Sequence, residues 1–179
     1  MRLFIAIDLP PHVRRAAADM AAQLRAYGAR GRFVPPENYH VTLRFIGESD
    51  ALPDAVDAMR SAVRDGRPFL LRLGGYGAFP GRAGRTGFVR VTGDLPELGR
   101  LHETLESALC ERGFGRGRGR LEPHVTLGRS ITGDDGFATV PDAAFAAGEA
   151  FPVQEITLFE SRRERGGMAY LPLHREPVG

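Results

Sequence analysis

The sequence has 179 residues, of which 42% are hydrophobic and 26% are charged, and its 24 basic and 22 acidic residues leave a net charge of +2. This length is typical of one domain, so we expect a single domain over residues 1–179 with a core large enough to need no stabilising disulfide. The net charge of +2 by itself indicates little about the partners of the protein. No apolar run approaches the ~20 residues that a membrane-spanning helix needs.

Two local features favour a cytoplasmic protein. The single cysteine, Cys110, excludes an internal disulfide and is typical of a reducing compartment. It follows Leu109 in an apolar helical pattern, so we expect a buried thiol with a packing role rather than a nucleophile. The first apolar run is followed by Asp8, Pro10 and Pro11 and by no small-residue cleavage site, unlike a secretion signal. We therefore expect the protein in the cytoplasm.

The first half of the chain alternates predicted strands with amphipathic helices. An apolar stretch of strand length opens the sequence, and the apolar residues from 13 to 27 then recur at the spacing of one helix face. In chain order, the pattern predicts a strand over 2–8, a helix over 13–27, a strand over 39–46, a helix that begins at Asp50 or Pro53 and ends at Gly66, and a strand over 69–73.

The second half adds a third helix and a hairpin. Six glycines between 74 and 87 predict a loop, and residues 130–149 are too irregular to assign. The pattern predicts a strand over 88–91, a helix over 94–112, a strand over 124–127, and closing strands over about 151–160 and 168–173 that flank a turn at 163–167. Strands and helices mix without a steady β-α-β rhythm, and the hairpin is antiparallel. The sequence therefore favours an α+β fold over a doubly wound sheet.

One tetrapeptide occurs twice. The sequence His-Val-Thr-Leu stands at 40–43 and, unchanged, at 124–127. The separation of 84 residues is close to half of the chain. The repeat predicts a protein of two lobes, each of which contributes one copy.

The repeat also predicts which side chains meet. Successive side chains of a strand point to opposite faces, so His and Thr share one face while Val and Leu anchor the other in a core. Two such strands present His40, Thr42, His124 and Thr126 to one ligand. This set suits phosphoryl chemistry: a neutral imidazole takes a proton from water and a protonated one gives a proton to the departing oxygen. The hydroxyls can donate to the phosphate oxygens.

Two other roles for the histidines are open at this point. A single histidine in a strand is commonly a satisfied core residue, but two identical copies half a chain apart favour a functional pair. Imidazoles also bind metals. However, the remaining histidines, His12, His102 and His174, have no metal-ligand spacing relative to the pair, and no second-position carboxylate or cysteine accompanies either copy. We therefore expect neither a metal nor another cofactor.

The paired His-x-Thr motifs resemble the signature of the 2H phosphoesterases. The surrounding residues look like those of the bacterial and archaeal RNA 2′,3′-cyclic phosphodiesterases, also called 2′-5′ RNA ligases. The matching segments are 2–10, 34–48, 123–129 and 155–161, followed by Tyr170 and Leu173. Together they span nearly the whole chain, and their combination is far more specific than either tetrapeptide alone.

The resemblance implies a bilobal fold in which two pseudo-symmetric lobes of antiparallel sheet plus helices enclose a central cleft. It implies catalysis without metal or nucleotide cofactor, with His40 as proton donor and His124 as proton acceptor. Thr42 and Thr126 would hold the phosphate, and the basic residue after the second motif, Arg129, would contact the ligand.

The alternation of side chains gives a different expectation for the arginines. Counting by twos from His124, Arg129 faces away from the cleft unless the strand ends or bulges at Gly128. The same count in the first copy places Arg44 beside His40. We expect Arg129 first and Arg44 second as the ligand contact.

The expected activity is hydrolysis of RNA 2′,3′-cyclic phosphodiester ends to 2′-phosphomonoesters. The same cleft would also allow reversible 2′-5′ joining of RNA ends, and the alternative from another class is a non-catalytic RNA-binding module. The expected partner is RNA with a 2′,3′-cyclic phosphate end, tRNA fragments among them, bound by a monomer away from any membrane.

One further segment is singled out by its charge. Four arginines lie between 112 and 120, interleaved with four glycines. Such a segment is flexible and strongly positive. We expect it to bind RNA backbone at the rim of the cleft; the alternative is a solvated loop.

Overall fold

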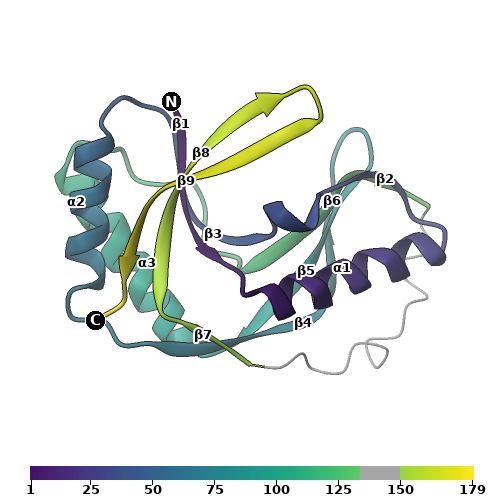
Figure 1. Ribbon diagram of the computed structural model, residues 1–179, viewed down its shortest axis with the longest axis horizontal. Coiled ribbons are helices and arrows are strands. Elements are labelled where there is room, and N and C mark those ends of the chain that lie inside the picture. The colour runs from purple at the N-terminus through teal and green to yellow at the C-terminus, as the bar shows by residue number, and fades with distance from the viewer. Residues whose placement is uncertain (134–149) are drawn as a thin grey trace.

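The structure is a computed structural model that describes residues 1–133 and 150–179 (Figure 1). Its elements are, in chain order, β1 (Arg2–Asp8), α1 (Pro11–Ala26), β2 (Arg30–Phe33), a short 3-10 helix (Pro36–Asn38), β3 (His40–Glu48), α2 (Leu52–Val63), β4 (Phe69–Phe79), β5 (Arg85–Gly93), α3 (Leu95–Glu111), β6 (His124–Thr132), β7 (Phe151–Val153), β8 (Glu155–Glu164) and β9 (Gly167–Pro177). No helix of the described residues is long and apolar enough to cross a membrane.

The three helices begin for the same local reason. Each has a proline in its first turn, where the missing N–H costs no hydrogen bond and the fixed φ favours the helix. Each then buries one apolar face, as the periodicity predicts. Helix α1 is followed at Gly28 by a residue with φ of 96°, a conformation that glycine adopts without strain.

The described strands form one antiparallel sheet. Its order is β7-β4-β5-β6-β3-β1-β8-β9, with β2 paired to β6 off this path. The two strands that carry the repeated tetrapeptide, β3 and β6, are neighbours at its centre, and Val41 pairs with Val125 between them. The two copies of the tetrapeptide therefore lie side by side on neighbouring antiparallel strands.

The repeat extends well beyond four residues. A unit of strand, helix and strand, β1-α1-β3, recurs as β5-α3-β6, and in each unit the two strands are antiparallel neighbours. Helix α1 begins at Pro11 and α3 at Leu95, while β3 begins at His40 and β6 at His124, so the offset of 84 residues holds for whole elements. The α+β fold with two pseudo-symmetric lobes is confirmed.

The core lies on the face of the sheet opposite the polar half of the repeat. Val41, Leu43, Val125 and Leu127 are at most 4% exposed and belong to one continuous apolar cluster. The helices cross between the lobes, because α1 contacts β6 and α3 contacts β3. Helix α2 packs beside α3, on the opposite side of the molecule from α1 (Figure 1).

The structure corrects the loop that was expected over 74–87. Strand β4 continues to Phe79 and pairs with β5 from Thr86 onward. Glycine here makes room within a sheet: a Cβ on Gly77 would lie 2.3 Å from a ring atom of Phe88. Strand β2 escaped prediction because its sequence, Arg-Gly-Arg-Phe, carries no apolar alternation.

Cys110 is exposed, so the expectation of a buried thiol is wrong. The buried face of α3 runs through Leu98, Leu101, Leu105 and Leu109. The next residue is rotated by about 100° from that face in a helix of 3.6 residues per turn. A helical residue that directly follows a buried leucine, as Cys110 follows Leu109, is therefore expected to point away from the core.

The closing hairpin is confirmed, but the strand expected over 151–160 is divided: residues 151–153 form β7, which pairs with β4, and the hairpin begins at Glu155. Strands β8 and β9 pair from Glu155 opposite Pro177 to Glu164 opposite Gly167. The irregular segment 130–149 contains the end of β6, and its residues 134–149 lie outside the described residues.

Candidate active site

The two repeated histidines are held in the same way. The Nδ1 of His40 lies 2.7 Å from the carbonyl oxygen of Asn38, and the Nδ1 of His124 lies 2.6 Å from that of Glu122. A carbonyl oxygen only accepts, so each Nδ1 carries a hydrogen and donates it. In the neutral ring this leaves Nε2 as the basic atom. Each lobe thus fixes its imidazole through the residue two positions earlier.

The polar half of each copy lines one cleft. His40, Thr42, His124 and Thr126 are partly buried and contribute to a cavity of about 1110 Å³. The Nε2 of His40 lies 3.0 Å from the hydroxyl oxygen of Thr42. The antiparallel register at Val41 and Val125 sets each histidine across from the threonine of the other copy. The four predicted side chains are therefore brought together.

The surroundings of His40 lower its pKa. Burial is the largest cause, because it disfavours the charged ring, and the positive charges of His124 and Arg129 act in the same direction. The hydrogen bond to the Asn38 carbonyl and the negative charge of Asp8 oppose the shift. His40 is therefore mostly neutral near pH 7 before a ligand arrives.

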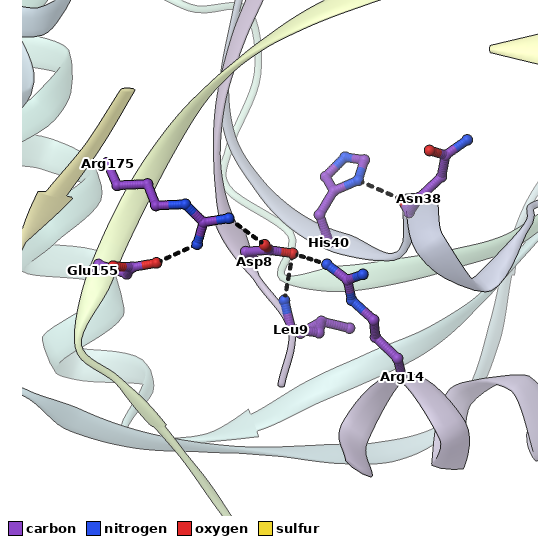
Figure 2. Close-up of polar contacts among 7 residues, drawn as sticks. All are labelled: Asp8, Leu9, Arg14, Asn38, His40, Glu155 and Arg175. Carbon is purple, nitrogen blue, oxygen red and sulfur yellow. Dashed lines mark hydrogen bonds and ion pairs between the residues drawn. The ribbon is translucent and has the colours of Figure 1, made fainter. Parts of the chain in front are cut away.

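The carboxylate of Asp8 is held by cations on both sides (Figure 2). It lies opposite His40 in the β1–β3 pairing, accepts a hydrogen bond from Arg14, and lies 3.4 Å from an Nη of Arg175, which also pairs with Glu155 at 2.6 Å. It makes no hydrogen bond to the imidazole. Asp8 therefore influences His40 through its field and not through contact.

Aromatic rings pack against both imidazoles. The ring centroid of Phe4 lies 5.0 Å from that of His40, and the ring centroid of Tyr170 lies 5.2 Å from it in an edge-on arrangement. On the other side, Phe79 lies edge-on to His124 at 5.2 Å. These rings restrict the orientation of the imidazoles and reduce their access to water.

Arg129 faces the cleft because β6 bulges. Phe88 pairs with Thr126 and Gly87 pairs with Gly128, so Leu127 is an extra residue on β6. One extra residue reverses the alternation of the residues that follow, up to the next shift of register between Gly128 and Ile131. Arg129 therefore lies on the same side as Thr126, lines the cavity and is exposed. The bulge therefore places Arg129 on the face that the resemblance requires, and its contact with a ligand stays a prediction.

A bulge of the same kind in β3 moves Arg44 off the face that the count by twos gave it, while its contact with a ligand stays a prediction. Ala6 pairs with Thr42 and Ile5 with Arg44, so one residue is extra there as well. The residue that reaches the position equivalent to Arg129 is Phe45, which is 57% exposed.

Arg44 borders the cavity, but its guanidinium is engaged within the protein. Its Nε lies 2.5 Å from Oε1 of buried Glu106, and its Nη atoms donate to the carbonyls of Phe45 and Gly115. These contacts favour a structural role over phosphate binding.

Sequence reasoning missed several residues that shape the cleft. Phe79 and Glu106 line it but stand in segments without a motif, and Phe45 lines it from within the matching segment 34–48 without having been singled out. Tyr170 is among the residues near the end of the chain that carry the resemblance, and this resemblance is the signal that could have pointed to it. Among the described residues, no group of three or more His, Cys, Asp or Glu side chains could hold a metal ion.

Comparison with known proteins agrees with this arrangement. The sequence model of the 2′-5′ RNA ligase superfamily matches residues 9–165. The chain belongs to this superfamily. Within it, the chain is similar to the RNA 2′,3′-cyclic phosphodiesterase of Thermus thermophilus, with 32% identity over 98% of this chain and 89% of that one. It is also similar to the enzyme of the same name from Escherichia coli, with 31% identity over 97% and 94% of the two chains.

Solved structures of superfamily members show the same fold. The TT0787 protein of Thermus thermophilus superposes with a TM-score of 0.77 at 28% identity, covering 99% of this chain and 98% of that one. Escherichia coli LigT complexed with 3′-AMP gives 0.76 at 28% identity, covering 99% and 97%.

Proposed function

We propose that this chain hydrolyses RNA 2′,3′-cyclic phosphodiester ends to 2′-phosphomonoesters by acid–base catalysis between His40 and His124, without a metal ion. The observation that carries the proposal is the pair of identical His-Val-Thr-Leu segments on adjacent strands, with both imidazoles fixed through Nδ1 in one cleft. Similarity to relatives named RNA 2′,3′-cyclic phosphodiesterase supports the choice of substrate.

The step needs one proton to be accepted and one to be donated. Neutral His124 takes a proton from water at Nε2 as the water oxygen attacks phosphorus. The bond from phosphorus to the 3′ oxygen breaks, and protonated His40 delivers its Nε2 proton to that oxygen. The products are a 2′-phosphomonoester and a free 3′-hydroxyl, and solvent restores the two protonation states.

Phosphate binding prepares His40 for its role. In the free enzyme the lowered pKa of the His40 ring leaves it mostly neutral, whereas a bound phosphate anion beside the imidazole favours the charged ring. Thr42 and Thr126 donate to the non-bridging oxygens, and Arg129 offers a guanidinium from the same face. Binding of substrate thereby charges the acid that the reaction needs.

Reversible 2′-5′ joining of RNA ends follows from the same groups. A 5′-hydroxyl in the place of water would lose its proton to His124 and attack the same phosphorus atom. The superfamily name supports this second activity. A non-catalytic RNA-binding module is the alternative that an activity measurement excludes.

The direct test uses a nucleoside 2′,3′-cyclic monophosphate and purified, chelator-treated protein. We expect turnover that chelation leaves unchanged, with the 2′-phosphate as the product seen by ³¹P NMR. Activity recovered only after zinc or manganese is added would overturn metal independence. Absence of turnover with intact binding would favour the binding module.

We propose that the enzyme acts as a monomer in the cytoplasm, with tRNA fragments among its substrates. Both histidines, both threonines and Arg129 come from one chain, so one copy supplies the full site. Light scattering during size exclusion should give the mass of one chain, 19.5 kDa. A stable dimer would contradict the monomer.

A further inference from the structure

The loop between α3 and β6 forms a wall of the cleft. Residues 116–120 line the same cavity as His40 and His124. The expectation that this segment borders the cleft is therefore confirmed in position.

The beginning of this wall is anchored to the catalytic strand. The backbone N–H of Gly117 donates to Oε2 of Glu106 at 2.8 Å, and Arg44 of β3 donates to the carbonyl of Gly115. Arg44 and Glu106 are themselves paired and nearly buried. A Cβ on Gly117 would lie 2.8 Å from Oε1 of Glu106 and 2.9 Å from Nε of Arg44, so a larger residue there would force this pair of side chains to shift. The loop is thus held against β3 two residues after Thr42.

The arginines of the segment divide into two kinds. Arg112 donates to the carbonyl of Ala108 and to Ser61, and Arg116 pairs with Glu103 at 3.1 Å. The remaining two are Arg118 and Arg120. They are exposed and have no hydrogen-bond or ion-pair partner within the described part of the chain.

Most of the acidic groups near these two arginines are already paired with other residues. The carboxylates of Glu103 and Glu106 are neutralised by Arg116 and Arg44. The other acidic group that lines this end of the cavity is exposed Glu122. Two free guanidinium groups against one free carboxylate leave a positive surface next to the phosphate site.

We propose that Arg118 and Arg120 bind the phosphodiester backbone of the nucleotides on the 5′ side of the cyclic phosphate. This inference rests on the proposed function: when the reacting phosphate closes the 3′ end, the rest of the RNA leaves the cleft from its 5′ side. The glycines around the two arginines allow them to follow different backbone conformations without reading bases. The loop therefore selects RNA ends over cyclic mononucleotides.

The test compares two substrates and two pairs of arginines. Arg118 and Arg120 are changed to Ser together, and the matched control carries Arg15→Ser and Arg64→Ser, which remove the same charge from exposed sites outside the cleft. Substrates are a nucleoside 2′,3′-cyclic monophosphate and a hexanucleotide with the same cyclic end. Affinity for a hexanucleotide that ends in a 2′-phosphate is measured by fluorescence anisotropy at 50 and 200 mM salt, without any need for turnover.

We expect the R118S/R120S variant to lose about 10-fold in kcat/KM and affinity on the hexanucleotides at low salt and less than 2-fold on the mononucleotide. For this variant, the slope of the logarithm of the binding constant against the logarithm of the salt concentration should be shallower by about 1.4. Each contact with a single-strand phosphate contributes about 0.7 to that slope. Equal losses on both substrates, no loss on the hexanucleotides, or the same loss in the control would overturn the proposal. If the wild type turns over neither substrate, the proposed function fails, while the anisotropy result still decides the role of the loop.

Discussion

His40 and His124 are chemically identical, and their surroundings must make one an acid and the other a base. Each Nδ1 donates to a backbone carbonyl, so that bond does not distinguish them. The lowered pKa of His40 is explained chiefly by burial. The division of roles therefore depends on the substrate, whose phosphate must raise the pKa of His40 so that this ring can act as the acid.

The first prediction concerns the titration of His40. In free protein its ring should titrate below 6.5 by NMR, and saturating 2′-phosphate nucleotide should raise the midpoint. Because the acid must be protonated, kcat/KM should fall as pH rises through the pKa of the free enzyme. The corresponding fall in kcat should come at higher pH, since bound phosphate keeps the proton on. A midpoint at or above 6.5 in the free protein would contradict this account.

Arg129 gives the second prediction. Its change to Ala should lower kcat/KM on a cyclic mononucleotide by on the order of 10²-fold, the scale for losing one group that stabilises transition-state charge. Arg32→Ala is the matched control. Arg32 lies opposite Arg129 in the backbone pairing of β2 with β6, but it does not line the cleft. Similar kinetics for the two variants would remove Arg129 from the site.

At the scale of elements, two bulges decide which side chains enter the cleft. The sequence predicted the strands of the repeat and the faces of His40, Thr42, His124 and Thr126, because alternation holds over three residues. The simple count by twos fails beyond Leu43 and Leu127, where an extra residue reverses the alternation. In the second copy Gly128 signals a possible bulge, whereas no local signal marks the change in the first copy. The expected loop over 74–87 failed for a related reason: glycines that relieve packing inside a sheet look like glycines of a turn.

A third prediction concerns Arg44, which joins β3 to α3 through Glu106. Arg44→Ala leaves the Glu106 carboxylate buried without its partner, and should lower the free energy of unfolding by about 3–5 kcal/mol. The double variant Arg44→Met with Glu106→Leu removes both charges and should recover most of this loss in urea denaturation. Arg100→Ala, which breaks an exposed pair, should leave the midpoint nearly unchanged. A double variant as unstable as the single one would refute the assignment.

At the scale of the whole molecule, a repeated β-strand, helix and β-strand unit builds one site from two halves. The offset of 84 residues holds for α1 and α3 as well as for β3 and β6, yet the tetrapeptide is the only run of four identical residues at that offset, and the other identities, such as Phe4 with Phe88, are scattered. The rest of each unit conserves the apolar spacing and not the residues, so the lobes could be predicted but their common unit could not. Adjacent pairing of β3 and β6 then turns two copies of one motif into a single acid–base pair.

The central claim is that His40 and His124 act as one unit on a 2′,3′-cyclic phosphate. The measurement is the single-turnover rate on a cyclic mononucleotide for His40→Ala, His124→Ala and the double variant, with His12→Ala as an exposed control outside the cleft. We expect each single variant to lose at least ~10²-fold. The double variant should lose far less than the product of the two, because removing either group already disables the pair. Near-normal turnover in either single variant, or fully multiplicative losses, would contradict the account.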